Sequence, residues 1–141
     1  MQKQLKNVDV FITHAWRYHA EWLEFCDQLK VLTDFNVRNF SLPWHDPAYL
    51  PSSKLGEKYL LGNLEGQIRA VDVVFVLDSL LVNKSCVKWI EVELGLAKKF
   101  GKKILLVLPA RGARMSIGHE SVFHDTIEAD AIAIGKALEN L

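Results

Sequence analysis

Glu93 is the residue of this 141-residue sequence whose position most suggests chemistry. It lies within CVKWIEVELGLAKKF, residues 86–100, a pattern typical of an amphipathic helix. With successive residues about 100° apart around a helix axis, most apolar side chains of this stretch fall within about 60° of Glu93. A carboxylate in such a stripe loses hydration, which costs several kcal/mol unless a partner compensates. Three arrangements are open: Arg69 or Lys102 pairs with Glu93, the carboxylate bends out past a short helix, or it lacks a partner until a ligand arrives.

Trp89 lies one turn before Glu93 on the same face of the predicted helix. Its position fits two roles equally well: a side chain of the hydrophobic core, or a surface on which a ring of a ligand stacks. Glu91 falls on the opposite face together with lysines, so we expect it to be an ordinary solvated charge.

The elements that must position Glu93 alternate along the chain. Apolar, β-branched stretches predict strands at residues 8–13, 71–79 and 103–109, and a shorter, more polar stretch at 36–41 predicts a strand at the edge of the sheet. Helical spacing of apolar residues predicts helices at 17–32, from Ser52 or Ser53 to about Ile68, and at 86–100, where Gly101 supplies the C′ position. Three glycines weaken the second helix, which we therefore expect to be short or irregular.

Residues 42–53, LPWHDPAYLPSS, hold three of the four prolines and must form a loop. After the strand at 103–109 the composition predicts mostly loop. A short strand near AIAIG, residues 131–135, and a terminal helical turn at 136–141 then follow.

Strands that alternate with helices and are apolar on both faces indicate an α/β protein. We expect one flavodoxin-like domain over residues 1–141, with a four- or five-stranded parallel sheet in the order 2-1-3-4-5 between two layers of helices. In such sheets ligands bind at the carboxyl ends of the strands, where the strand order reverses. This rule selects His14 and its neighbours, the loop from Pro43 onward, and Asp78 with Ser79.

Composition and missing motifs exclude several classes of protein. Lysine plus arginine equals aspartate plus glutamate at 17 each, so nothing favours a nucleic-acid partner. No apolar run approaches the roughly 20 residues that span a bilayer, and the N-terminal stretch does not resemble a secretory signal. We therefore expect no membrane partner and a cytoplasmic location.

Sequence signatures of common cofactor sites are also missing. There is no GxGxxG, no GxxxxGK[ST] and no GxSxG motif, and His14 and His19 have no companion ligands at metal-binding spacing. We expect neither a bound metal nor a resident cofactor.

Three segments together resemble the Toll/interleukin-1 receptor (TIR) domain family: VFITHAW, the proline- and aromatic-bearing loop after the second strand, and SCVKWIEVELGLAKKFGKKILLVLP. The spacing Trp89-x-x-x-Glu93 between the third and fourth strands carries most of this resemblance. Within this family, the sequence resembles the bacterial TIR-like proteins of Thoeris antiphage defence.

The resemblance implies an enzyme that cleaves the bond between nicotinamide and ribose in NAD, with NAD as substrate and Glu93 as the catalytic residue. It also implies substrate contacts from Phe11, Thr13, His14, Trp44, His45 and Trp89. The resemblance further implies self-association through TIR contacts and a separate effector protein that responds to an ADP-ribose-derived product.

Two other functions fit the same sequence. One is a TIR scaffold that only assembles with other TIR domains. The other is an enzyme similar to nucleoside deoxyribosyltransferases, which share this type of sheet and use a carboxylate to attack a sugar. Base exchange between deoxynucleosides, with no activity on NAD, would distinguish the last of these.

Overall fold

The computed structural model describes residues 5–13, 19–41, 54–78, 84–108 and 123–141. The elements in chain order are β1 (Lys6–Ile12), α1 (His19–Lys30), β2 (Phe35–Asn39), α2 (Lys54–Ala70), β3 (Val73–Leu77), α3 (Lys84–Lys99), β4 (Lys103–Leu108), β5 (Asp125–Glu128) and α4 (Ala131–Glu139). No helix in this described part of the chain is long and apolar enough to cross a membrane.

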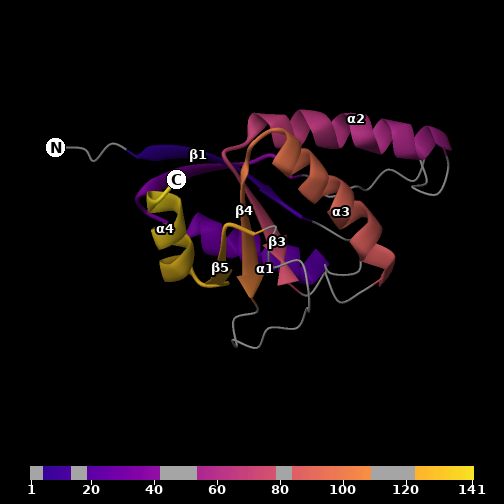
Figure 1. The fold of residues 1–141 in the computed structure, drawn as a ribbon. Coiled ribbons are helices and arrows are strands. Elements are labelled where there is room, and N and C mark those ends of the chain that lie inside the picture. Colours follow the sequence, from indigo (N-terminus) through magenta and orange to yellow (C-terminus); the bar gives the residue numbers. More distant parts are fainter. Residues whose placement is uncertain (1–4, 14–18, 42–53, 79–83, 109–122) are drawn as a thin grey trace.

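The five strands form one sheet in the order β2-β1-β3-β4-β5, and every pair is parallel. This confirms the predicted α/β fold class and strand order. Figure 1 shows the sheet between two pairs of helices, with α2 and α3 side by side on one face and α1 and α4 on the other. Strand order therefore reverses between β1 and β3, the pair of strands that flanks the crevice expected in this fold.

The two faces of the sheet are identified by one aromatic contact. The rings of Phe75 in β3 and Phe25 in α1 lie 5.0 Å apart, so Phe75 points toward α1. Ile12 is the register partner of Phe75, and Phe11 is the partner of Val74. Because side chains alternate along a strand, Phe11 and Val74 point to the opposite face, which α2 and α3 cover.

The prediction that glycines make α2 short was wrong, since this helix runs for 17 residues. Nothing lies within 4 Å of the position where a Cβ would sit at Gly62 or Gly66. The glycines therefore occupy open positions, while Leu64 and Ile68 on the opposite side are buried in the core. Burial of that apolar face outweighs the roughly 1 kcal/mol of helix propensity that each glycine loses.

Gly101 ends α3 as predicted. Its φ of 67° is left-handed, and its N–H donates to the Lys98 carbonyl at 3.1 Å, while the Lys102 N–H donates to the Ala97 carbonyl at 2.9 Å. These two bonds make a Schellman motif. The chain then enters β4 at Lys103.

The expected strand at residues 131–135 was wrong, because these residues begin α4. Asp130 caps this helix, and its carboxylate accepts a hydrogen bond from the Ala133 N–H at 2.8 Å. Ile134 and Leu138, one turn apart, are fully buried, which is the spacing of a helix face. The fifth strand instead lies earlier, at Asp125–Glu128.

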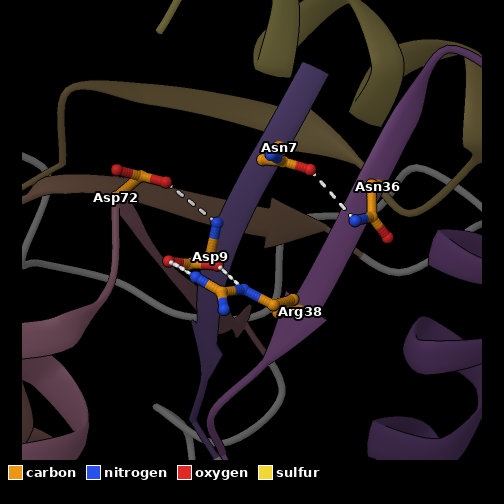
Figure 2. A network of polar contacts seen from close by, with 5 residues as sticks. All are labelled: Asn7, Asp9, Asn36, Arg38 and Asp72. Atoms are coloured by element: carbon orange, nitrogen blue, oxygen red, sulfur yellow. Dashed lines mark hydrogen bonds and ion pairs between the residues drawn. The ribbon is translucent and has the colours of Figure 1, made fainter. Parts of the chain in front are cut away.

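Polar side chains of β1 and β2 face one another across the two strands (Figure 2). The Arg38 guanidinium donates to both carboxylate oxygens of Asp9 at 2.6 and 2.8 Å, and Asn36 donates to Asn7 at 3.0 Å. The Asp72 carboxylate accepts from the Asp9 backbone N–H at 2.9 Å. Each pair joins register partners or neighbouring strands, so the network ties β2, β1 and the start of β3 together.

Candidate functional site

Four polar or charged residues are buried in the part of the chain that the structure describes: Thr13, Ser41, Asp78 and Glu93. The first three follow β1, β2 and β3, which are neighbours in the sheet. Since parallel strands all end at the same edge, the buried polar groups collect where ligands bind in this architecture. Glu93 lies on α3, which leaves β3 from that same edge.

Glu93 has an unusual environment for a carboxylate. Only 5% of the residue is exposed, and its Oε2 has no hydrogen-bond partner among the described residues. Burial raises the pKa of Glu93 to about 8, so its neutral form is favoured at neutral pH. Neighbours on its helix face include Ile90, Leu96 and Ala97, all buried and apolar. The predicted place of Glu93 within the apolar stripe is confirmed.

The alternative that Arg69 or Lys102 neutralises Glu93 was wrong. All three side chains are described, and Glu93 forms an ion pair with neither cation. The Arg69 guanidinium instead lies over the ring of Phe100, 4.9 Å from the ring centroid. Phe100 is two turns beyond Glu93 on the same helix face, so the Arg69 charge is held at the far end of α3.

Phe11 and Thr13 lie on the same face of the sheet as α3. Phe11 is buried and points toward the α2 and α3 layer, and Thr13 follows it by two residues, the repeat of a strand. Thr13 is fully buried, and its Oγ1 accepts a hydrogen bond from the Leu77 N–H at 3.3 Å. The structure thus places two of the residues implied by the family resemblance on the side of the sheet that carries Glu93.

Ser41 is a buried residue that sequence reasoning did not select. The side-chain Oδ1 of Asn39 accepts hydrogen bonds from the Ser41 N–H at 2.9 Å and from the Ser41 hydroxyl at 2.5 Å. The Asn39 amide in turn donates to the Cys26 sulfur of α1 at 3.4 Å. An asparagine two residues before a serine is an Asx-turn pattern, which was the available signal. Asp78, which the topology rule did select, is 1% exposed.

The remaining predicted site residues cannot be placed beside Glu93. His14, Trp44 and His45 lie outside the described residues. The backbone of Trp89 belongs to α3, but its side chain is outside the description. Across the described ranges, no group of three or more histidine, cysteine, aspartate or glutamate side chains is arranged to hold a metal ion.

Comparison with known proteins adds a similarity of fold. No family model and no curated protein match this sequence. Among solved structures, the fold is similar to that of the CMP N-glycosidase BcmB of Clostridium botulinum, with a TM-score of 0.51 and 19% sequence identity over 94% of this chain and 99% of that one. At this identity the similarity shows the shared α/β fold over nearly the whole length of both chains.

Proposed function

We propose that this protein cleaves the N-glycosidic bond between the base and the ribose of a nucleotide, with Glu93 as the catalytic carboxylate. The observation that carries the proposal is the environment of Glu93. It is buried, and among the described residues no cation pairs with it and no donor forms a hydrogen bond to its Oε2. Burial of an unpaired carboxylate costs free energy, and such a group is suited to stabilising a positive charge that develops only during a reaction.

The chemistry requires a negative charge beside the sugar. When the bond between C1′ and the base nitrogen breaks, its electron pair leaves with the base and the ribose gains oxocarbenium character. Ionised Glu93 stabilises that cation, and the low polarity of its surroundings strengthens the attraction. Water then bonds to C1′ and loses a proton, so the products are the free base and a ribose with a hydroxyl group at C1′.

NAD is the first candidate substrate, on the strength of the TIR resemblance around Trp89 and Glu93. Nicotinamide leaves NAD as a neutral molecule, so this reaction needs no acid to protonate the base. What it needs is an anion opposite the ribose, the role proposed for Glu93. TIR membership, self-association and a separate effector that responds to an ADP-ribose-derived product belong to the same proposal.

A pyrimidine nucleotide is the second candidate substrate, because BcmB, whose fold is similar, is a CMP N-glycosidase. Cytosine departs as an anion unless it receives a proton, so this substrate would add a demand for a general acid. The two substrates share the bond type and the position of the carboxylate. They differ in whether a proton must reach the base.

The test uses purified protein with NAD and CMP in separate reactions, and chromatography to measure free nicotinamide and free cytosine. In Glu93→Gln the rate of base release is expected to fall by about 100-fold or more, the loss typical of enzymes from which a group that stabilises transition-state charge is removed. Glu91→Gln is the matched control, since it makes the same change two residues away on the exposed side of α3. Equal activity of the two variants would contradict the role of Glu93.

The scaffold alternative makes the opposite prediction. A TIR domain that only assembles would release neither base at any protein concentration, while changes in the Pro43 to Pro51 loop would alter its oligomeric state. The deoxyribosyltransferase-like alternative predicts base exchange between deoxynucleosides and no reaction with NAD.

A further inference from the structure

The hydrogen bonding between β1 and β3 changes character at Thr13. The two strands pair in register from Val10 with Val73 to Ile12 with Phe75. The Thr13 N–H then donates to the Phe75 carbonyl at 2.9 Å, as the next bond of a parallel ladder should. By the same pattern the following bond would run from the Leu77 N–H to the Thr13 carbonyl.

In the structure the Leu77 N–H donates to the Thr13 side chain instead, at 3.3 Å from Oγ1. No backbone hydrogen bond joins Leu77 to Thr13, both of which are described. A hydroxyl therefore takes the place of a peptide carbonyl as the acceptor. The backbone ladder between β1 and β3 therefore ends one hydrogen bond earlier than continued pairing would allow.

On its other edge β3 shows no such interruption. Leu77 remains the register partner of Val107 in β4, so β3 and β4 stay paired to the end of β3. The replacement of a backbone acceptor by a side chain is thus found between β1 and β3 and not between β3 and β4. The strands β1 and β3 are the pair between which strand order reverses, and ligands bind in the crevice at such a point.

Burial makes this hydrogen bond consequential. Thr13 is fully buried and Leu77 is 5% exposed, so an unsatisfied Leu77 N–H would have no ready access to water. Without the hydroxyl, the N–H must find the Thr13 carbonyl, which closes the ladder. The hydroxyl satisfies this donor without a backbone hydrogen bond between the two strands.

We propose that Thr13 is a positioning residue: its hydroxyl ends the pairing of β1 with β3 one hydrogen bond early and so opens the crevice through which substrate reaches Glu93. The inference rests on the proposed function, and it gives Thr13 a role distinct from direct contact with substrate. The opening lies on the side of the sheet that carries α3, because Thr13 follows Phe11 by one strand repeat.

The test compares Thr13→Val with Thr13→Ser. Valine has nearly the same shape as threonine but no hydroxyl, whereas serine keeps the acceptor. In Thr13→Val we expect KM for the cleaved nucleotide to rise about tenfold or more, with kcat changed less than about threefold, because access is reduced while Glu93 is intact. Thr13→Ser should restore KM to within about threefold of wild type.

Thr126→Val is the matched control. It removes the same hydroxyl group, but from an exposed residue on the edge strand β5. It should leave both kinetic constants unchanged. Wild-type KM in Thr13→Val, or failure of Thr13→Ser to restore it, would overturn the proposal. A fall in kcat at unchanged KM would also overturn it, because that result assigns Thr13 to the chemical step.

A second measurement is independent of activity. In a crystal structure of Thr13→Val, the Leu77 nitrogen is expected within hydrogen-bonding distance of the carbonyl of residue 13, with β1 and β3 closer together there. An unchanged strand separation would refute the positioning role even if wild-type protein cleaves no nucleotide. Conversely, suppose that β1 and β3 are closer together in Thr13→Val while wild-type protein cleaves no nucleotide. That result would support the role of Thr13 in strand pairing and contradict the proposed function.

Discussion

Glu91 and Glu93 are two residues apart on α3 and have opposite surroundings. Glu91 is exposed, whereas Glu93 is 5% exposed with an Oε2 that has no hydrogen-bond partner in the described part of the chain. A helix rotates by about 200° over two residues, so one carboxylate faces water and the other faces the core. This pair provides an internal comparison for every experiment on Glu93.

Glu93 should make the stability of the protein depend on pH. Its pKa is raised from 4.5 to about 8, so between these values the folded state binds a proton that the unfolded state has lost. Stability from this group is therefore present below pH 4.5 and is lost as pH rises toward about 8. The total loss is expected to be about 5 kcal/mol.

Denaturant unfolding of wild type and Glu93→Gln at several pH values between 5 and 8 would measure this contribution. The difference in unfolding free energy between the two proteins should shift in favour of Glu93→Gln as pH rises. Glu91→Gln should follow wild type. A constant difference between wild type and Glu93→Gln would show that Glu93 does not titrate in this range.

The rate of base release should also depend on whether Glu93 is ionised. The value of kcat/KM reflects ionisation in the free enzyme, and an ionised carboxylate is needed to oppose the oxocarbenium charge. For NAD we expect kcat/KM to rise with pH and level off above about 8, the raised pKa of Glu93. A profile that instead falls above this pH would indicate that Glu93 acts as an acid, as cleavage of CMP would require.

The Asp72 carboxylate should stabilise the start of β3, since it accepts a hydrogen bond from the Asp9 N–H at 2.9 Å (Figure 2). The Asp72 backbone N–H also donates to the Asp9 carbonyl, at 2.7 Å. Asp72→Ala removes the first of these bonds and should lower the unfolding free energy by about 1 kcal/mol. Asp72→Asn keeps a carbonyl acceptor and should lose less. If thermal unfolding shows both variants equally destabilised, charge rather than the hydrogen bond is responsible.

Gly101 and Gly95 should respond in opposite directions to alanine. Gly101 has a φ of 67°, which strains any residue with a Cβ, so Gly101→Ala should cost about 1 kcal/mol or more. Gly95 lies inside α3 and is exposed, with nothing within 4 Å of its Cβ position. Gly95→Ala should therefore stabilise the protein by roughly 0.5 to 1 kcal/mol. Destabilisation by both changes would mean that the helix ends differently in solution.

The Cys26 thiol should react slowly in the folded protein. Burial raises its pKa to about 11, so very little thiolate is present near pH 8. In a Cys86→Ser background, alkylation of Cys26 by iodoacetamide at pH 8 should be at least about tenfold slower than in denatured protein. Equal rates would show that the α1 and β2 contact around Cys26 opens readily.

Local periodicity was enough to predict most of the architecture. The strands β1 to β4 and the helices α1 and α3 follow from two-residue and 3.6-residue patterns of apolar side chains, and so does the place of Glu93 within the stripe of α3. The C-terminal region was the exception. Asp130 as a helix cap and the one-turn spacing of Ile134 and Leu138 were present in the sequence, but AIAIG is apolar enough to suit a strand equally well.

Other features depend on residues that the fold brings together. Arg69 was a plausible partner for Glu93 until the packing of α2 against α3 placed its guanidinium over Phe100. The bond from Leu77 to Thr13 joins residues 64 positions apart. No periodic pattern encodes such a pair, since only the register of β1 with β3 decides which side chain meets which N–H. The sequence by itself determined that a carboxylate would be buried on α3, because the apolar stripe is a local pattern. The tertiary structure decided that neither Arg69 nor Lys102 neutralises it, because only packing between elements sets which side chains meet.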